Sequence, residues 1–73
     1  MQLHVEVMLT ETRAEHPARW HAAVQKVLEV AGLRDADLER AARDGVLRGV
    51  MSSERLLDLA VLDVVADFQL DPG

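Results

Sequence analysis

The side chains best suited to metal binding or acid–base chemistry are three histidines, and their spacing does not bring them together. His16 and His21 are five positions apart, which separates their side chains by about 140° around a helix axis. His4 belongs to another segment and lies on its expected solvent side. We therefore expect solvated histidines and no metal site.

The two adjacent serines give no better support for nucleophilic chemistry. Ser52 and Ser53 stand directly before a leucine-rich stretch, where serine commonly caps the first turn of a helix. The sequence contains no cysteine, no Gly-X-Ser-X-Gly turn and no glycine-rich phosphate loop. It is short and acidic like a carrier protein, but "VMSSERL" lacks the Asp-Ser-Leu serine that carriers modify. We expect no catalytic residues, no cofactor and no enzymatic activity.

Four aspartates recur at intervals of four or five residues near the C-terminal end: Asp58, Asp63, Asp67 and Asp71. This spacing has two interpretations. It can form an acidic patch that docks on a partner, or it can be the solvent-facing side of an amphipathic helix and strand. The spacing alone does not separate them.

Length and composition predict a single small domain, residues 1–73. Hydrophobic residues form 49% of the chain, more than a disordered segment has and enough to leave an apolar face for docking or homodimerisation. The net charge is −5 and the arginines lie among acids, so we expect no nucleic-acid binding. Residues 1–12 do not predict a signal peptide, and no apolar run approaches the roughly 20 residues of a membrane span. We expect a cytoplasmic protein that binds no membrane.

Two elements are predicted in the first half of the chain. The alternation in "QLHVEVML" predicts a half-buried strand over residues 2–9. Residues 16–33 then predict a helix, with Pro17 in its first turn and Gly32 at a left-handed C-terminal cap. Its apolar face consists of Trp20, Val24, Val27 and Ala31. We expect this helix to lie across the first strand.

Residues 35–44, "DADLERAARD", fit two structures. Asp35 can cap a helix that Ala, Leu, Glu and Arg fill and that Gly45 ends. The Arg-Asp-Gly turn between two candidate strands would instead close a hairpin. Both alternatives stay open.

The apolar stretch from Leu56 to Ala66 decides the fold. As one helix it would present apolar side chains on every side, which a domain of 73 residues cannot bury. We therefore expect a serine-capped helix that ends near Ala60, followed by a strand. The inward residues of this strand would be Val64, Ala66, Phe68 and Leu70, and the outward residues Val65, Asp67 and Gln69. Upstream, residues 46–51 predict a short strand with Gly49 at a close backbone approach.

These elements predict a small α+β domain, a sandwich of the ferredoxin-like split β-α-β type. The element order is βαββαβ if residues 35–44 form a strand, and βααβαβ if they are helical. One sheet would carry helices on one face and leave the other face open.

The segments "VLRGVMSSERLLDLA" and "VVADFQLD" resemble the C-terminal half of subtilisin propeptides and of the free-standing propeptide-like protease inhibitors. The shared features are a glycine among apolar residues, a serine-capped helix with leucines, and a valine-rich strand that ends in acidic residues. The matching positions are Leu47, Gly49, Met51, Ser52, Leu56, Leu59, Val64, Val65 and Asp71.

The resemblance implies that the open sheet face docks on two surface helices of a serine protease, with acidic groups at the helix N-termini. Asp71 matches the acidic position, and Gln69 and Leu70 stand where a second acid often occurs. Two features depart from the family. Only two residues follow the acid, where the family has a tail for the protease cleft, and "DLERAARDG" favours a helix where the family has a strand.

We therefore expect a non-catalytic interaction module, most specifically an inhibitor or chaperone of a subtilisin-type protease. Its expected partner-binding residues are Val65, Asp67, Gln69 and Asp71. The alternative is a small homodimeric regulatory or adaptor protein of a bacterial toxin–antitoxin or defence operon. The marginal core and the surplus of apolar residues favour that alternative.

Overall fold

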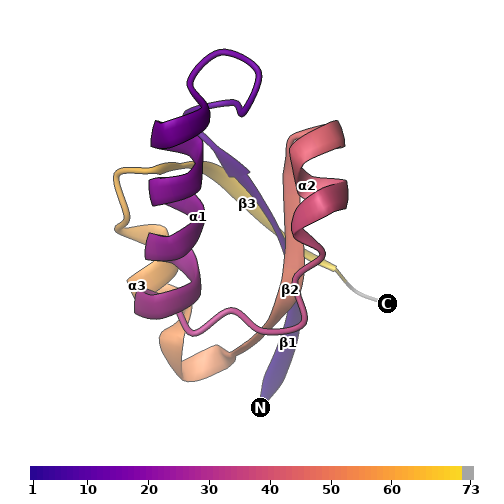
Figure 1. The fold of residues 1–73 in the computed structure, drawn as a ribbon. Coiled ribbons are helices and arrows are strands. Elements are labelled where there is room, and N and C mark those ends of the chain that lie inside the picture. Colours follow the sequence, from indigo (N-terminus) through magenta and orange to yellow (C-terminus); the bar gives the residue numbers. More distant parts are fainter. Residues whose placement is uncertain (72–73) are drawn as a thin grey trace.

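The computed structural model describes the backbone of residues 1–71 and the side chains of residues 1–70, which form a three-stranded sheet and three α-helices (Figure 1). The elements are β1 (Gln2–Leu9), α1 (Pro17–Val30), α2 (Leu38–Asp44), β2 (Val46–Ser52), the 3-10 turn η1 (Ser53–Arg55), α3 (Leu56–Ala60) and β3 (Val65–Asp71). The prediction of a small α+β domain is confirmed at this level.

β1 is the central strand of the sheet. The strand order is β2-β1-β3, and both neighbours run antiparallel to β1. β2 and β3 are therefore parallel to each other, and β2-α3-β3 is a β-α-β unit with β1 inserted between its strands. Val5 lies between Gly49 of β2 and Leu70 of β3. Val5 and Val7 are buried, as the alternation of β1 predicts.

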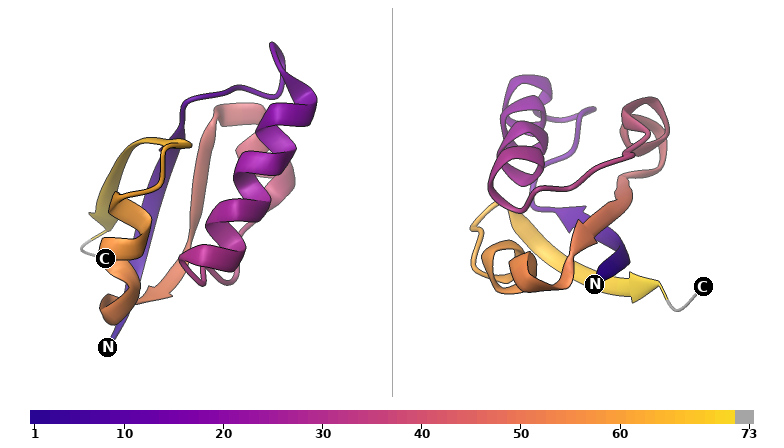
Figure 2. Two further views of the ribbon diagram at one scale, coloured as in Figure 1. Left: turned by 90° about the vertical axis from the view of Figure 1, so that its left-hand side faces the viewer. Right: turned by 90° about the horizontal axis from the view of Figure 1, so that it is seen from below.

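α1 packs on the sheet and supplies much of the core. Its buried residues are Trp20, Ala23, Val24 and Val27. Trp20, Val24 and Val27 join the inward residues of β1 and β2 and Leu59 of α3 in one hydrophobic cluster. Gly32 follows the helix with a φ of 69°, the left-handed conformation predicted for it. The second view of Figure 2 shows α1 and α2 on the same side of the sheet.

The uncertain segment 35–44 contains helix α2, so the helical alternative is the one found. Its N-cap is Asp37, whose side chain accepts the backbone N–H of Arg40 at 3.1 Å. Asp35, the expected cap, lies before it in the loop. Gly45, with a φ of 79°, ends the helix. The element order is therefore βααβαβ, and the βαββαβ alternative with a fourth strand over these residues is wrong.

The C-terminal apolar stretch divides into a short helix and a strand, as predicted. Ser52 accepts the backbone N–H of Glu54 at 3.3 Å and so caps the turn that leads into α3. Leu59 is the buried residue of α3, whereas Leu57 is 73% exposed. A helix of this length has one buried side, so the domain does not need to surround it.

The loop before α2 approaches β2 closely at Gly49 and forms hydrogen bonds with the outer backbone groups of this strand. Arg34, in the loop before α2, exchanges two backbone hydrogen bonds of 2.8 Å with Val50. A Cβ on Gly49 would lie 2.6 Å from the Arg34 carbonyl oxygen and 2.8 Å from Leu33 Cγ. The prediction of a close approach at this glycine is confirmed.

We expect Gly49→Ala to lower the free energy of unfolding by about 1–3 kcal/mol, the usual range for overpacking, because the Arg34 loop has to move. Urea unfolding followed by the fluorescence of Trp20 measures this loss. Gly45→Ala is the matched control, because it adds the same methyl group where no atom lies within 4 Å and strains only the backbone. Faster hydrogen exchange at the Arg34 and Val50 amides should appear in Gly49→Ala alone. Unchanged exchange there would contradict the role assigned to Gly49.

Candidate interaction surface

The sheet face opposite α1, named the open face below, carries a mixed set of side chains. They are His4, Glu6 and Met8 on β1, Val46, Arg48 and Val50 on β2, and Asp67 and Gln69 on β3. All of them are exposed or half-buried, and none belongs to the core cluster. This face is therefore accessible to a partner.

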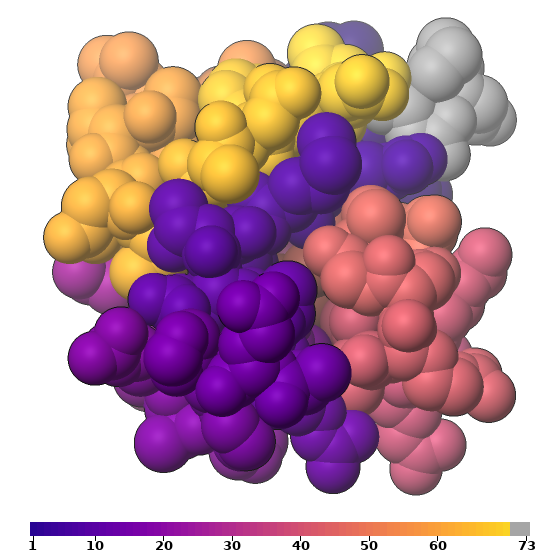
Figure 3. Space-filling model, turned by 90° about the horizontal axis from the view of Figure 1, so that it is seen from above, coloured from indigo at the N-terminus to yellow at the C-terminus, as the bar shows by residue number. Residues whose placement is uncertain are grey.

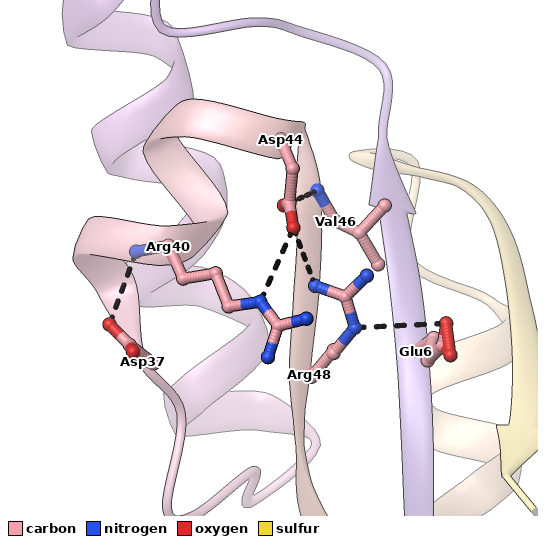
Figure 4. Close-up of polar contacts among 6 residues, drawn as sticks. All are labelled: Glu6, Asp37, Arg40, Asp44, Val46 and Arg48. Atoms are coloured by element: carbon pink, nitrogen blue, oxygen red, sulfur yellow. Dashed lines mark hydrogen bonds and ion pairs between the residues drawn. The ribbon is translucent and has the colours of Figure 1, made fainter.

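Charged side chains link α2 to the open face beside β2 (Figure 4). Asp44, the last residue of α2, accepts an Nη1–H of Arg48 at 2.7 Å and the backbone N–H of Val46 at 3.0 Å. The Arg40 Nε lies 3.6 Å from the same carboxylate. The Arg48 Nε lies 3.9 Å from a carboxylate oxygen of Glu6 on β1. Acids and arginines therefore neutralise one another in this cluster.

The Asp44–Arg48 hydrogen bond changes the protonation equilibria of both groups. The Arg48 guanidinium holds the pKa of the Asp44 carboxyl below its ordinary value, and the Val46 N–H adds to this effect. The same bond raises the pKa of Arg48. Both shifts favour the charged pair. The pair holds the end of α2 beside β2.

A shallow hollow of about 350 Å³ lies between this charged cluster and the start of α2. Asp37 lines it but already caps α2, and Arg40 and Arg48 line it but already bind Asp44. No group of three or more metal-binding side chains forms within residues 1–70.

Two of the four predicted partner-binding residues lie on the open face. Asp67 is opposite Met8 in the β1–β3 register, and its side chain is exposed. Gln69 is opposite Glu6 and is also exposed. The Asp67 Oδ1 accepts the backbone N–H of Phe68 at 2.8 Å. No ion pair among residues 1–70 involves Asp67, so its charge is available to a partner.

Val65 does not point outward as expected, because a β-bulge interrupts the ladder between Met8 and Leu9. Met8 pairs with Asp67 and Leu9 pairs with Val65, so Ala66 is the extra residue of β3. Val65 thus lies on the side of Leu9 and packs against the core. Ala66, which the alternation predicts to point inward, is exposed. The outward orientation predicted for Val65 is wrong.

The predicted acidic series does not form one continuous patch over the described side chains. Asp58 binds Arg55 at 3.1 Å, and Asp63 binds Lys26 at 3.2 Å. These two ion pairs lie at α3 and just beyond it, which supports the structural interpretation of both acids. The side chain of Asp71, the fourth predicted partner-binding residue, lies outside the described part of the structure.

The three histidines have different neighbours in the fold. His4 is on the open face, His16 Nε2 lies 3.9 Å from Glu11, and the His21 ring centroid lies 5.7 Å from that of Trp20. They do not converge on a common site.

Sequence reasoning missed the Asp44–Arg48–Glu6 cluster. Asp44 and Arg48 are four positions apart, a spacing that signals a pair within a helix. Here the chain leaves the helix between them, at Gly45. The signal is usable only when the position of that helix end is known.

Comparisons with known proteins assign no family to the chain. It matches no protein-family model, and no curated protein and no solved structure is significantly similar to it. Within residues 1–71, none of the helices has the length and apolar character needed to cross a membrane.

Acid should remove the contribution of the Asp44–Arg48 pair to stability. A carboxyl whose pKa is lower in the folded chain stabilises the fold above its unfolded pKa of about 3.9, and this contribution is lost as the pH falls through the folded value. Asp44→Asn should therefore lower the free energy of unfolding at neutral pH, and this effect should fade at a pH below the lowered folded pKa of Asp44. Urea unfolding at both pH values measures the difference.

The control for this prediction is the same substitution in a background that lacks the partner. In Arg48→Met, Asp44→Asn should have a smaller further effect at neutral pH, because the Arg48 hydrogen bond is already absent and only the contacts of Asp44 with Val46 and Arg40 remain. An equal loss in both backgrounds, or a loss that does not depend on pH, would contradict the pairing.

Proposed function

We propose that the chain is a non-catalytic protein-interaction module whose open face docks on another protein through β3. The position of Asp67 and Gln69 carries this proposal. Both are exposed polar side chains on a sheet face that contributes nothing to the core. Asp67 has no cationic partner among the described residues, so a docking partner has to compensate its charge.

A helix N-terminus is the partner surface that fits this arrangement best. It offers free backbone N–H groups and positive potential, and both stabilise a carboxylate. Asp67 and Gln69 are two residues apart and lie on the same face of β3. The half-buried side chain of Met8, opposite Asp67 in the register, supplies apolar contact beside it.

We also propose that the fold is a reduced form of the ferredoxin-like split β-α-β fold. The β2-α3-β3 unit with β1 inserted supports this assignment. Arg34 pairs with Val50 on the side of β2 where a fourth strand would lie. In this view α2 replaces most of that strand.

The most specific form of the proposal is a propeptide-like inhibitor or chaperone of a subtilisin-type protease. The strand–helix–strand order over residues 46–71 supports it, as do the Ser52 cap and the close approach at Gly49. These are the features on which the resemblance to that family rests. Asp67 adds an acid on the face that docks in such a family.

Titration against a subtilisin-type protease with a chromogenic peptide substrate tests this specific form. We expect inhibition in the nanomolar-to-micromolar range. Asp67→Lys should weaken it roughly tenfold, because a positive charge would face the positive end of a helix. Glu29→Lys, the same charge reversal on the exposed side of α1, should inhibit like the original chain. No inhibition at high micromolar concentration would remove the protease form of the proposal.

The docking face itself can be tested without a known partner. A photo-crosslinking side chain at Gln69 should capture a partner protein in the cells that produce this chain, and the crosslinked peptide should include the first turn of a helix. The same side chain at Glu29 should not capture that partner. Equal capture from both positions would show that the open face is not the docking surface.

A separate observation favours a second candidate, the homodimeric regulatory or adaptor protein. Apolar side chains are exposed around α3 and β3: Leu57 is 73% exposed, Val61 72% and Leu70 49%. Association of two copies can bury part of this surface.

A further inference from the structure

The two edges of the sheet differ in how their backbone groups are satisfied. On the outer side of β2, Arg34 exchanges two hydrogen bonds with Val50, and α2 packs beside the strand. β3, in contrast, pairs only with β1 in the described chain. Figure 3 shows β3 in yellow along one margin of the molecule. An unpaired strand edge of this kind is a template for another strand.

The pairing of β2 determines which residues of β1 bond to which neighbour. Successive strand residues direct their backbone groups to opposite sides. Val50 bonds outward to Arg34, so Gly49 bonds inward to its partner in β1, Val5. The backbone groups of Val5 therefore point to β2, and those of its neighbours in β1 point to β3.

The same alternation identifies which backbone N–H and C=O groups of β3 are not bonded to β1. Glu6 points to β3 and pairs with Gln69. Gln69 therefore bonds to β1, and its neighbours Phe68 and Leu70 direct their N–H and C=O groups away from the sheet. The hydrogen bond from the Phe68 N–H to Asp67 Oδ1 agrees with this, because a free N–H is available to a local side chain.

We infer that β3 pairs with β3 of a second copy of this chain, antiparallel about a twofold axis through Phe68. The pairing joins two three-stranded sheets into one continuous sheet. In this register Phe68 of one chain faces Phe68 of the other chain, and Leu70 faces Ala66 of the other chain. Asp67 faces Gln69 of the other chain. The outward backbone groups of Phe68 then bond to each other across the axis.

This register is self-complementary, which singles out a second copy as the occupant. When the second strand takes up the Phe68 N–H, the Asp67 carboxylate loses that donor and gains the side-chain amide of Gln69 from the other chain. No aspartate faces an acid in these pairs. On the helix-covered side, Leu70 is 49% exposed and Phe68 is half-buried, and both gain apolar neighbours. A strand of arbitrary sequence offers neither the Asp67–Gln69 contact nor the apolar contacts of Phe68 and Leu70.

The pairing is weak and reversible. The bulge at Ala66 limits the paired length, and each chain carries a net charge of −5. The dimer therefore forms at micromolar to millimolar protein concentration and strengthens as salt screens the repulsion.

Sedimentation equilibrium combined with amide hydrogen exchange tests the inference. We expect reversible dimerisation, with the amides of Phe68 and Leu70 becoming protected as the concentration rises. Gln69→Glu is nearly isosteric and places an acid opposite Asp67 at both ends of the pairing, so it should weaken the dimer roughly tenfold. Adding Asp67→Asn exchanges the two members of the pair and should restore the dimer.

Several outcomes would overturn the inference. One is a chain that stays monomeric at millimolar concentration, and another is a Gln69→Glu variant that dimerises like the original chain. Leu57→Lys removes an exposed leucine of α3 and leaves the edge of β3 intact. Loss of the dimer in that variant would indicate unspecific apolar association instead.

Failure of this inference is distinguishable from failure of the proposed function. Gln69→Glu adds an acid to the open face, so it should not weaken docking on helix N-termini although it weakens the dimer. Asp67→Lys should weaken docking even in a chain that proves strictly monomeric.

Discussion

Over residues 1–71, every hydrogen bond between two strands of the sheet involves β1, and the alternation of its backbone constrains the rest of the sheet. Leu3, Val5 and Val7 point their side chains toward the helices and direct their backbone N–H and C=O groups to β2. The residues between them point to the open face and pair with β3. The side-chain pattern and the pairing pattern thus share one period of two. A slip of β1 by one residue would turn its core side chains to the open face. It would also turn the backbone groups that bond to β2 toward β3, and those that bond to β3 toward β2. The register of β1 is therefore strongly specified.

The same constraint explains why one sheet edge is covered and the other is not. Between α1 and β2 the chain has enough length for a loop, a bridge at Arg34 and helix α2. Gly49 lets that loop approach β2 closely. Between α3 and β3 only residues 61–64 connect the elements, which is too short a path to return along the outer side of β3. The exposed edge of β3 therefore follows from the lengths of the two connections.

Periodicity predicted the elements that bury one side against the core. It placed β1 and α1 correctly, and the limit on how much a small domain can bury placed the end of the third helix near Ala60. Periodicity could not decide whether residues 35–44 form a helix or a strand, because a tertiary contact determines which of the two forms. Arg34 forms a single-residue β-bridge with Val50 and so occupies the outer side of β2. No local sequence pattern predicts a bridge of this kind.

The candidate site was predictable in part for a related reason. Asp67 and Gln69 alternate with Phe68 in regular strand geometry, so their outward orientation followed from the pattern. Val65 and Ala66 are both small and apolar, and a period of two fits either register. The sequence pattern therefore does not predict the extra residue that forms the bulge. The partner-binding role of these residues stays a prediction.

Docking through the open face and pairing through the edge both depend on Asp67 and Gln69, so the two proposals are linked. In the single chain, Asp67 Oδ1 holds the Phe68 N–H and thereby blocks the free edge, as charged residues do on many edge strands. In the dimer, the same carboxylate turns to the Gln69 amide of the other chain and is less available to a helix N-terminus. By linkage, dimerisation and docking then weaken each other by the same factor. The concentration of the chain itself would decide how much of it is free to dock.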